Sequence, residues 1–299
     1  MSAVLIIMSG QPAVSASDAG RTACDFLRIG TGARAAGMGG AYTAISSGAS
    51  ASFWNPSGLA DIDGGEIALG HFAWYQDTRL EHGTIAFSLG HRAGLAISAT
   101  YLGYGKIAGY SSSGQATGNI SANDYSGAMS LGYSVSDFLS VGITGKFIGQ
   151  RLDDVSATTY ALDLGIRLIK DRWAVGMVVA NIGPDIVFEV EKGNLPTTTR
   201  IGLSGFPVDQ LLVSVELERG RFGELVWHNG IDYCLSEQYH LRMGHRHRPS
   251  EPDDDLASGL TFGVGVELRG YSFDYAFTRE ASASNENLHR FSLTIRFGQ

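Results

Sequence analysis

The segment Leu260–Gly270 reads LTFGVGVELRG, and its side chains alternate strictly in character. Leu, Phe, Val, Val and Leu occupy the even positions up to 268, whereas Thr, Gly, Gly and Glu occupy the odd positions up to 267. Successive side chains of a β-strand point to opposite faces, so a period of two residues predicts a strand with one apolar face. Its length matches the ~9–11 residues of a tilted transmembrane strand better than the ~5–6 residues typical of soluble proteins.

The same alternation recurs along the chain from Gly65 onward. It defines fourteen segments, which we take as strands: 65–75, 83–90, 93–105, 124–135, 139–152, 158–170, 172–183, 195–208, 210–220, 224–236, 238–247, 258–270, 271–279 and 288–298. An antiparallel sheet of a soluble protein also alternates, and there the outer face is heavily charged. Here one face is large and aromatic, the other mixes small residues with charges, and only 17% of the 299 residues are charged. The pattern therefore favours strands that face lipid.

The connections between these segments alternate between short and long. The short ones lie at 91–93, 136–138, 170–171, 206–210, 236–238 and 270–271, and the long ones at 76–82, 106–123, 152–157, 184–194, 218–223, 248–258 and 280–287. Outer-membrane barrels have tight periplasmic turns and longer external loops on an even number of antiparallel strands. Strands in hydrocarbon must also close on themselves, because an open edge leaves backbone amides unpaired. The sequence thus predicts an all-β fold, an antiparallel transmembrane barrel of about fourteen strands in an outer membrane.

Aromatic residues gather near the segment ends, where a membrane barrel carries its interfacial girdles. The expected girdle residues are Trp74, Tyr75, Tyr101, Tyr104, Trp173, Trp227, Tyr233, Tyr239, Tyr271, Tyr275 and Phe297. This placement predicts contact with outer-membrane lipid and lipopolysaccharide.

Three regions follow from the composition of the chain. Residues 1–16 contain a short apolar run and a small-residue cleavage pattern, which predict a signal peptide. Residues 17–64 precede the first strand, and residues 65–299 form the barrel. Barrels of eight strands fill their interior with side chains, and barrels of 16–18 strands leave an aqueous channel, so a lumen of fourteen strands needs a filling. The Gly/Ala/Ser-rich segment 26–60 is suited to that role as a plug, or hatch.

The hatch segment resembles two families of outer-membrane proteins. The blocks ARAAGMGGAYTA at 33–44 and NPSGLA at 55–60 resemble the start of PorV/PorQ proteins and, more distantly, the hatch of FadL-type channels. The first resemblance implies a non-enzymatic accessory of type IX protein secretion or surface display, with translocon components or secreted cargo as partners. The second implies a passive channel for small hydrophobic compounds. The FadL-like hatch further implies a kink at Asn55 and Pro56, with Arg34, Met38 and Tyr42 beside the ligand path.

Charged residues on the small-sided face of the strands are expected to point into the lumen. They carry both signs and should pair with one another and with the hatch backbone: Lys146, Asp163, Arg167, Arg200, Glu216, Asp232, Arg242, Glu267, Asp274 and Arg296. We expect a structural role for these groups first.

Other classes of function find little support in the sequence. The net charge is −8 without a basic patch, which argues against nucleic-acid binding. His245 and His247 share one strand face, yet no third metal ligand accompanies them, and the acidic segment 251–255 lacks the spacing of a calcium loop. We find no catalytic constellation, and we expect no cofactor and no metal. The two cysteines, Cys24 and Cys234, permit either a disulfide or free thiols.

Overall fold

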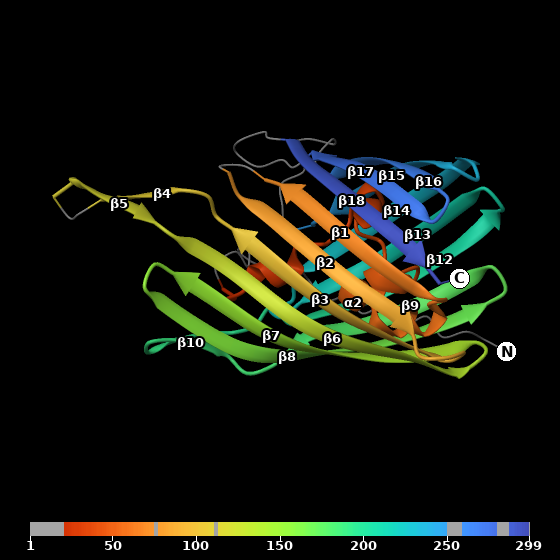
Figure 1. The fold of residues 1–299 in the computed structure, drawn as a ribbon, viewed down its shortest axis with the longest axis horizontal. Coiled ribbons are helices and arrows are strands. Elements are labelled where there is room, and N and C mark those ends of the chain that lie inside the picture. The colour runs from red at the N-terminus through yellow and green to blue at the C-terminus, as the bar shows by residue number, and fades with distance from the viewer. Residues whose placement is uncertain (1–20, 75–76, 111–112, 250–258, 280–286, 299) are drawn as a thin grey trace.

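The computed structural model describes residues 21–74, 77–110, 113–249, 259–279 and 287–298. Fourteen antiparallel strands form one closed barrel, in the order β1-β18-β17-β16-β15-β14-β13-β12-β9-β8-β7-β6-β3-β2 (Figure 1). The barrel strands are β1 Gly65–Ala73, β2 Arg79–Ser88, β3 Ala93–Gly103, β6 Ala122–Ser136, β7 Leu139–Leu152, β8 Val155–Lys170, β9 Trp173–Ile182, β12 Thr198–Val208, β13 Leu211–Gly220, β14 Leu225–Ser236, β15 Tyr239–His247, β16 Leu260–Leu268, β17 Tyr271–Arg279 and β18 Asn287–Phe297. The pairing of β1 with β18 closes the ring, so the expected barrel is confirmed.

All fourteen expected strands are present, and each end lies within four residues of its predicted place. One expected connection is wrong. The segment 152–157 was predicted to be a long loop, but β7 and β8 continue until Leu152 pairs with Val155. Asp153 takes a left-handed conformation, with φ of 53°. Asp tolerates this conformation in tight turns, so two residues suffice where the sequence suggested six.

Two small hairpins were not predicted. Strands β4 Ile107–Tyr110 and β5 Ala116–Ile120 pair with each other in the connection between β3 and β6, and project well beyond the barrel wall (Figure 1). Strands β10 Ile186–Phe188 and β11 Glu191–Gly193 pair in the connection between β9 and β12. Both lie in segments that the sequence analysis assigned to long loops.

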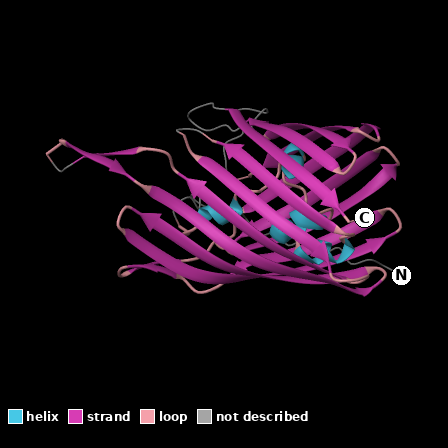
Figure 2. Ribbon diagram, viewed as in Figure 1, coloured by secondary structure: helices cyan, strands magenta, loops and turns pink. Residues whose placement is uncertain are grey.

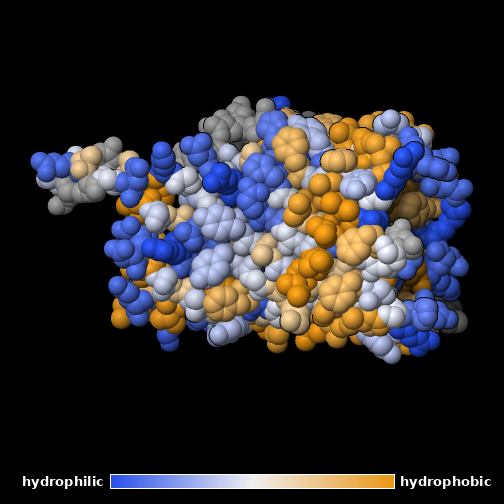
Figure 3. All heavy atoms as spheres, viewed as in Figure 1, coloured by the Kyte–Doolittle hydropathy of each residue, from blue (hydrophilic) through white to orange (hydrophobic). Residues whose placement is uncertain are grey.

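The two faces of the wall differ as the alternation predicts, and β8 shows this most clearly. Its residues alternate between exposed and buried over most of its length, with Leu162 and Leu164 outside and Asp163 inside. On the visible face of the molecule, hydrophobic side chains gather over the middle of the strands and hydrophilic ones over both ends (Figure 3). An apolar outer band between polar rims is the surface that a bilayer requires of a barrel.

Helical segments lie inside the ring of strands, as Figure 2 shows. They are η1 Asp25–Arg28, α1 Ala33–Gly37, η2 Gly48–Ser50, α2 Ala51–Trp54 and η3 Pro56–Asp61. Among the described residues, no helix has the length and apolar character needed to cross a bilayer. The expected signal peptide, residues 1–16, lies outside the described residues.

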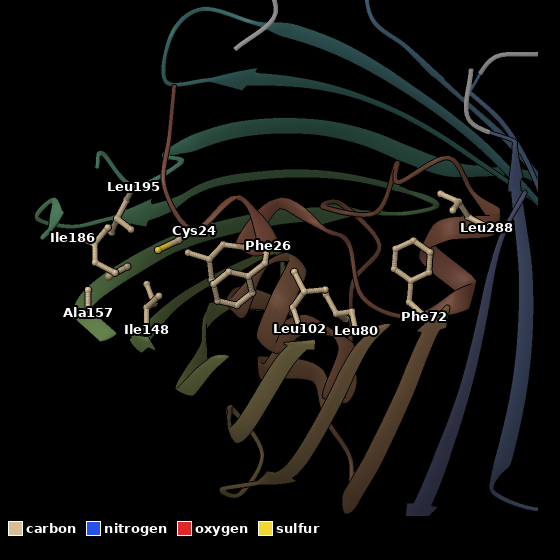
Figure 4. Close-up of a cluster of buried hydrophobic side chains, with 12 residues drawn as sticks. Cys24, Phe26, Phe72, Leu80, Leu102, Ile148, Ala157, Ile186, Leu195 and Leu288 are labelled. Atoms are coloured by element: carbon tan, nitrogen blue, oxygen red, sulfur yellow. The ribbon is translucent and has the colours of Figure 1, made fainter. Parts of the chain in front are cut away.

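An apolar cluster joins the beginning of the hatch to the wall at the long-loop end. Its members come from the hatch, from six barrel strands and from the β10–β11 segment: Cys24, Phe26, Leu27, Phe72, Leu80, Leu102, Ile148, Ala157, Ala161, Ile186, Leu195 and Leu288 (Figure 4). Part of the lumen is therefore filled by apolar side chains, which the sequence analysis did not anticipate.

Both cysteines are free thiols. Burial, together with the nearby carboxylates of Asp124 and Asp25, raises the pKa of the Cys24 thiol to about 12. Only the thiolate is a strong nucleophile, so Cys24 stays protonated and shielded at pH 8.

In a Cys234→Ser variant, we expect Cys24 to resist maleimide in the folded barrel and to react fully after unfolding, as measured by mass spectrometry. Rapid labelling of the folded variant would contradict the burial of this segment.

The expected aromatic girdle is largely confirmed. Eight of the eleven expected residues are exposed, namely Tyr101, Tyr104, Trp173, Trp227, Tyr233, Tyr239, Tyr271 and Phe297, whereas Tyr275 is half-buried. Trp74 was assigned wrongly, because it stacks on the buried Phe72 ring with centroids 5.3 Å apart. The Tyr104 hydroxyl donates to the buried carboxylate of Asp124 at 2.7 Å, so it too is bound to the interior. Tyr75 lies outside the described residues.

Candidate functional site

The hatch rests on a ring of glycines in the wall, which we name the glycine belt. A Cβ atom added at any of these positions would come within 3.4 Å of a hatch atom: Gly94, Gly132, Gly142, Gly165, Gly176, Gly202, Gly230, Gly244 and Gly263. Several of these glycines face each other on neighbouring strands. Gly132, for example, pairs with Gly94 on one side and with Gly142 on the other. Glycine within a strand often marks the close approach of another backbone. Here it lets the hatch backbone lie directly against the wall.

Buried carboxylates of the wall hold the hatch by its backbone amides. Glu216 on β13 accepts from the amides of Tyr42 and Thr43, at 3.0 and 2.8 Å. Glu66 on β1 accepts from the amide of Ala49 at 2.7 Å. Hydrogen bonds to charged acceptors are stronger than neutral ones, so each carboxylate is a firm anchor.

An arginine and a histidine of the wall hold the hatch carbonyls. Arg167 on β8 donates to the Ser46 carbonyl at 2.8 Å and forms an ion pair with Asp61. His228 on β14 lies with its Nδ1 2.7 Å from the Gly39 carbonyl oxygen. The hatch is thereby attached to separate strands of the barrel.

The inward charges expected from the sequence are confirmed, and each of the ten has a charged partner. The pairs include Lys146 with Asp163 at 2.7 Å and Arg242 with Asp274 at 2.5 Å. Other pairs join two of the ten predicted residues to each other. The partners from outside the predicted ten are Asp61, Glu218, Arg34, His240 and Glu66. These networks neutralise the lumen wall around the hatch.

Asn55 is fully buried at the turn between α2 and η3. Its side-chain amide donates to the carbonyls of Thr43 and Ile166, at 3.0 and 3.2 Å. Its side-chain oxygen accepts from the amide and hydroxyl of Ser57, at 3.2 and 2.7 Å. Asn55 thus caps η3 and connects two hatch turns to the wall.

The other expected path residues occupy different surroundings. Arg34 lies 3.4 Å from Asp232 and lines a lumenal cavity, which Tyr42 also lines. Met38 is completely buried in a cluster with Tyr42. Pro56 is buried beside the glycine belt. Their role along a ligand path remains a prediction, as does that of Asn55.

Two cavities flank the hatch. One of about 90 Å³ lies toward the short turns and is lined by Arg34, Tyr42 and Glu66, among others. One of about 380 Å³ lies toward the long loops, between the hatch and β12–β18, and we name it the vestibule. Trp54 lines both, and its indole N–H donates to the Thr31 carbonyl at 3.1 Å. Trp54 therefore borders both cavities.

Several anchors were missed in the sequence analysis: Asp61, Glu66, Glu218 and His228. Glu218 could have been found, because it stands two residues after Glu216 on the same strand face. His245 and His247 do lie on one face, with their rings stacked and centroids 6.1 Å apart. Within the described part of the chain, no cluster of three or more His, Cys, Asp or Glu residues could hold a metal ion. The acidic segment 251–255 lies outside it.

The fold and this site together define a class of protein, a membrane β-barrel whose lumen is closed by an N-terminal hatch. The sequence model of the family described as "Type IX secretion system protein PorV" matches residues 14–218. The chain belongs to this PorV family and is an outer-membrane barrel.

Several solved structures share the fold at low sequence identity. The CymD monoaromatic hydrocarbon channel is 14% identical with a TM-score of 0.67, over 91% of this chain and 98% of that one. The Pseudomonas putida toluene transporter TodX is 12% identical with a TM-score of 0.64, over 89% and 97%. A Pseudomonas aeruginosa FadL homologue is 12% identical with a TM-score of 0.60, over 90% and 98%. No curated protein matched the sequence.

Proposed function

We propose that this protein is a non-enzymatic accessory of type IX secretion, which receives or shuttles cargo bearing a C-terminal signal for export or surface display. Membership of the PorV family supports the secretion role. The observation that carries the proposal is the seating of the hatch on the glycine belt with charged anchors on several strands. A lumen closed in this way does not conduct a polypeptide, so the barrel acts by binding its partners.

The proposed partners fall into two groups. Translocon components or secreted cargo are the functional partners, and outer-membrane lipid with lipopolysaccharide is the surrounding medium. Exposed aromatic side chains at the strand ends, such as Trp173 and Trp227, support the second group.

The proposal is tested in the native host. Affinity purification of the tagged protein from detergent-solubilised outer membrane should recover translocon components or cargo, identified by mass spectrometry. Deletion of the gene should leave cargo proteins unexported, and the unsubstituted gene should restore export. A matched control is cargo without its C-terminal signal, which should not be recovered. Normal export in the deletion strain would refute the proposal.

A FadL-like passive channel for small hydrophobic compounds is the second candidate. Trp54 lines both cavities, so movement of its side chain would change the barrier between them. Of the similar structures, TodX is named as a toluene transporter and CymD as a monoaromatic hydrocarbon channel. Under this alternative, replacing Asn55 and Pro56 with Ala should change toluene uptake by cells at least severalfold. Under the secretion proposal, cells with the unsubstituted protein and cells with the variant should both take up toluene at the rate of the deletion strain.

A further inference from the structure

One edge of β8 has no neighbouring strand near the long-loop end of the barrel. On its β7 side, β8 is paired from Val155 onward. On its β9 side, the ladder runs up from Lys170, which keeps the ring closed, and stops where Leu162 pairs with Ile182. The stretch 155–161 therefore has a ladder partner on one side only, and we name it the free edge. Within the described part of the chain, no backbone hydrogen bond joins it to the segment that follows β9.

The chain that follows β9 turns toward the lumen and does not continue along the free edge. The buried Thr159 hydroxyl, on the inner face of β8, donates to the Pro184 carbonyl at 3.2 Å. Ile186 is completely buried in the apolar cluster that also contains Ala157 and Ala161, two further inward residues of the free edge. Figure 4 shows Ile186 and Ala157 together at one end of this cluster. The segment thus packs on the inner face of β8, and no ladder covers its edge.

Alternate residues of the free edge direct their backbone groups away from β7. In an antiparallel strand, the N–H and C=O of one residue point to the same side, and those of the next residue point to the other side. A Cβ atom added to Gly183 would overlap the Tyr160 carbonyl oxygen, so this carbonyl points to the β9 side. The backbone groups of Ser156 and Thr158 therefore point to that side as well. Their donors and acceptors have the spacing that another extended backbone matches.

The free edge lacks the usual protection against strand addition. Natural proteins commonly place charged residues or Pro on exposed sheet edges. The free edge reads VSATTYA, without charge or Pro, and Val and Thr are residues that favour strands. Its outward side chains are exposed, and that of Tyr160 is exposed to 65%. The stretch is thus an accessible template for a further strand.

An apolar hollow on the outer wall adjoins the free edge at Tyr160. Its volume is about 520 Å³, and its lining includes Phe147, Tyr160, Leu162 and Ile182. Gly145 also lines it and contributes no side chain to fill it. The rings of Phe147 and Tyr160 are 5.6 Å apart between centroids. Aromatic and β-branched pairs across strands stabilise sheets, so a strand added here would place one such side chain in the hollow.

We propose that the free edge of β8 binds an extended segment of a partner polypeptide by strand addition. The partner backbone pairs with Ser156, Thr158 and Tyr160, and an aromatic or branched apolar side chain of the partner fills the hollow. The free edge begins beside the turn at Asp153, at the end of the barrel from which the β4–β5 hairpin projects (Figure 1). Long loops of outer-membrane barrels are external, so the partner approaches from outside the cell. This inference goes beyond the proposed secretion function, and its test does not depend on that function.

The test uses the full-length protein in zwitterionic nanodiscs and a fluorescein-labelled peptide that copies residues 145–152. This segment of β7 already pairs with β8 on the other side, where Phe147 faces Tyr160. Fluorescence anisotropy, with empty nanodiscs as background, should show saturable binding below ~1 mM. Failure to bind at that concentration would overturn the proposal.

N-methylation of the peptide tests whether the backbone is recognised. Two further peptides carry N-methyl groups on one or the other set of alternate amides. Only one set faces β8 in an added strand, so one peptide should bind at least tenfold more weakly and the other nearly as well as the parent. Equal binding of the two methylated peptides would show that no ladder forms.

Substitutions locate the binding on the free edge. Thr158→Pro removes an N–H that points away from β7, so the ladder with β7 keeps its bonds while the free edge loses a donor. Peptide binding should fall at least tenfold, whereas the matched control Thr158→Val, which keeps the N–H, should bind nearly as well. Thr158→Lys, which adds a charge of the kind that protects natural edges, should also weaken binding and does not alter the backbone. Unaltered heat-modifiable mobility identifies folded variants, and a folded Pro or Lys variant with unchanged binding would overturn the proposal.

The free edge and the secretion role fail in distinguishable ways. If the peptide binds with alternating sensitivity to N-methylation while export is normal in the deletion strain, the free edge stands and the secretion role is wrong. If export fails in the deletion strain while the peptide does not bind, the secretion role stands and the free edge is wrong.

Discussion

The double variant Gly132→Val/Gly142→Val is expected to conduct ions in planar lipid bilayers, whereas the unsubstituted protein should stay closed. A Cβ at either glycine would lie 2.6 Å from the carbonyl oxygen of Pro56, well below ordinary contact. The obstacle is backbone on both sides, so the hatch must move. Overpacking costs about 1–3 kcal/mol per site, and each 1.4 kcal/mol is tenfold. The open population should rise on the order of a hundredfold.

The matched control is Gly127→Val/Gly145→Val on the same two strands. A Cβ at either of these glycines meets no atom within 4 Å, so the hatch should remain seated. Both variants should retain heat-modifiable mobility, which confirms a folded barrel. Equal conductance of the two double variants, or a closed Gly132→Val/Gly142→Val barrel, would show that the glycine belt does not seat the hatch.

Arg242→Met is expected to destabilise the barrel strongly. The Arg242 side chain is only 1% exposed and donates to Asp232 at 3.0 Å and to Asp274 at 2.5 Å. Its removal leaves two carboxylates without their shared cation, and breaking a buried ion pair costs about 3–5 kcal/mol. The measurement is urea unfolding in lipid vesicles, followed by tryptophan fluorescence. The unfolding midpoint should fall clearly.

An exposed ion pair on the same wall provides the comparison. Arg172 and Asp209 have side chains that are 55% and 78% exposed. Such pairs contribute about 0–1 kcal/mol, so Arg172→Met should leave the midpoint nearly unchanged. Similar losses in the two variants would show that burial does not determine the value of these charges.

The wall of the barrel was predictable because each strand carries its own signal. In β8, Leu162 and Leu164 face outward while Asp163 faces inward, and this alternation is visible without any knowledge of neighbouring strands. The inward charges followed from the same periodicity. The closed ring followed from the requirement that every backbone amide in hydrocarbon be paired.

Features that depend on distant contacts were not predictable. The glycine belt needs each wall glycine to meet a hatch residue far away in sequence, as Gly244 meets Gly39. The burial of Ile186 and Leu195 depends on the β10–β11 segment packing toward Cys24, which no local pattern indicates. The tight turn at Asp153 depends on a backbone conformation that Asp only tolerates.

Part of the candidate site was predictable because it, too, carries a local sequence signal. Asn55 and Pro56 stood out as a turn, and the structure places them at a buried turn of the hatch. The vestibule was not anticipated, because the residues that line it come from the hatch and from many barrel strands and converge only when the barrel closes. A single residue such as Arg290 carries no sequence signal for that convergence.

Lipid contact around the whole ring is the most direct test of the barrel. Single cysteines in a Cys24→Ser/Cys234→Ser background, at outward Leu162, Leu203, Ile231 and Phe262 and at inward Ala161, Ser204 and Thr261, would each be labelled with a small fluorophore before folding into vesicles. Brominated lipids should quench every outward label strongly and every inward label weakly. Two results would contradict a closed barrel with its apolar face in the membrane. One is equal quenching of outward and inward labels, and the other is an outward label on β8, β12, β14 or β16 that brominated lipid does not quench.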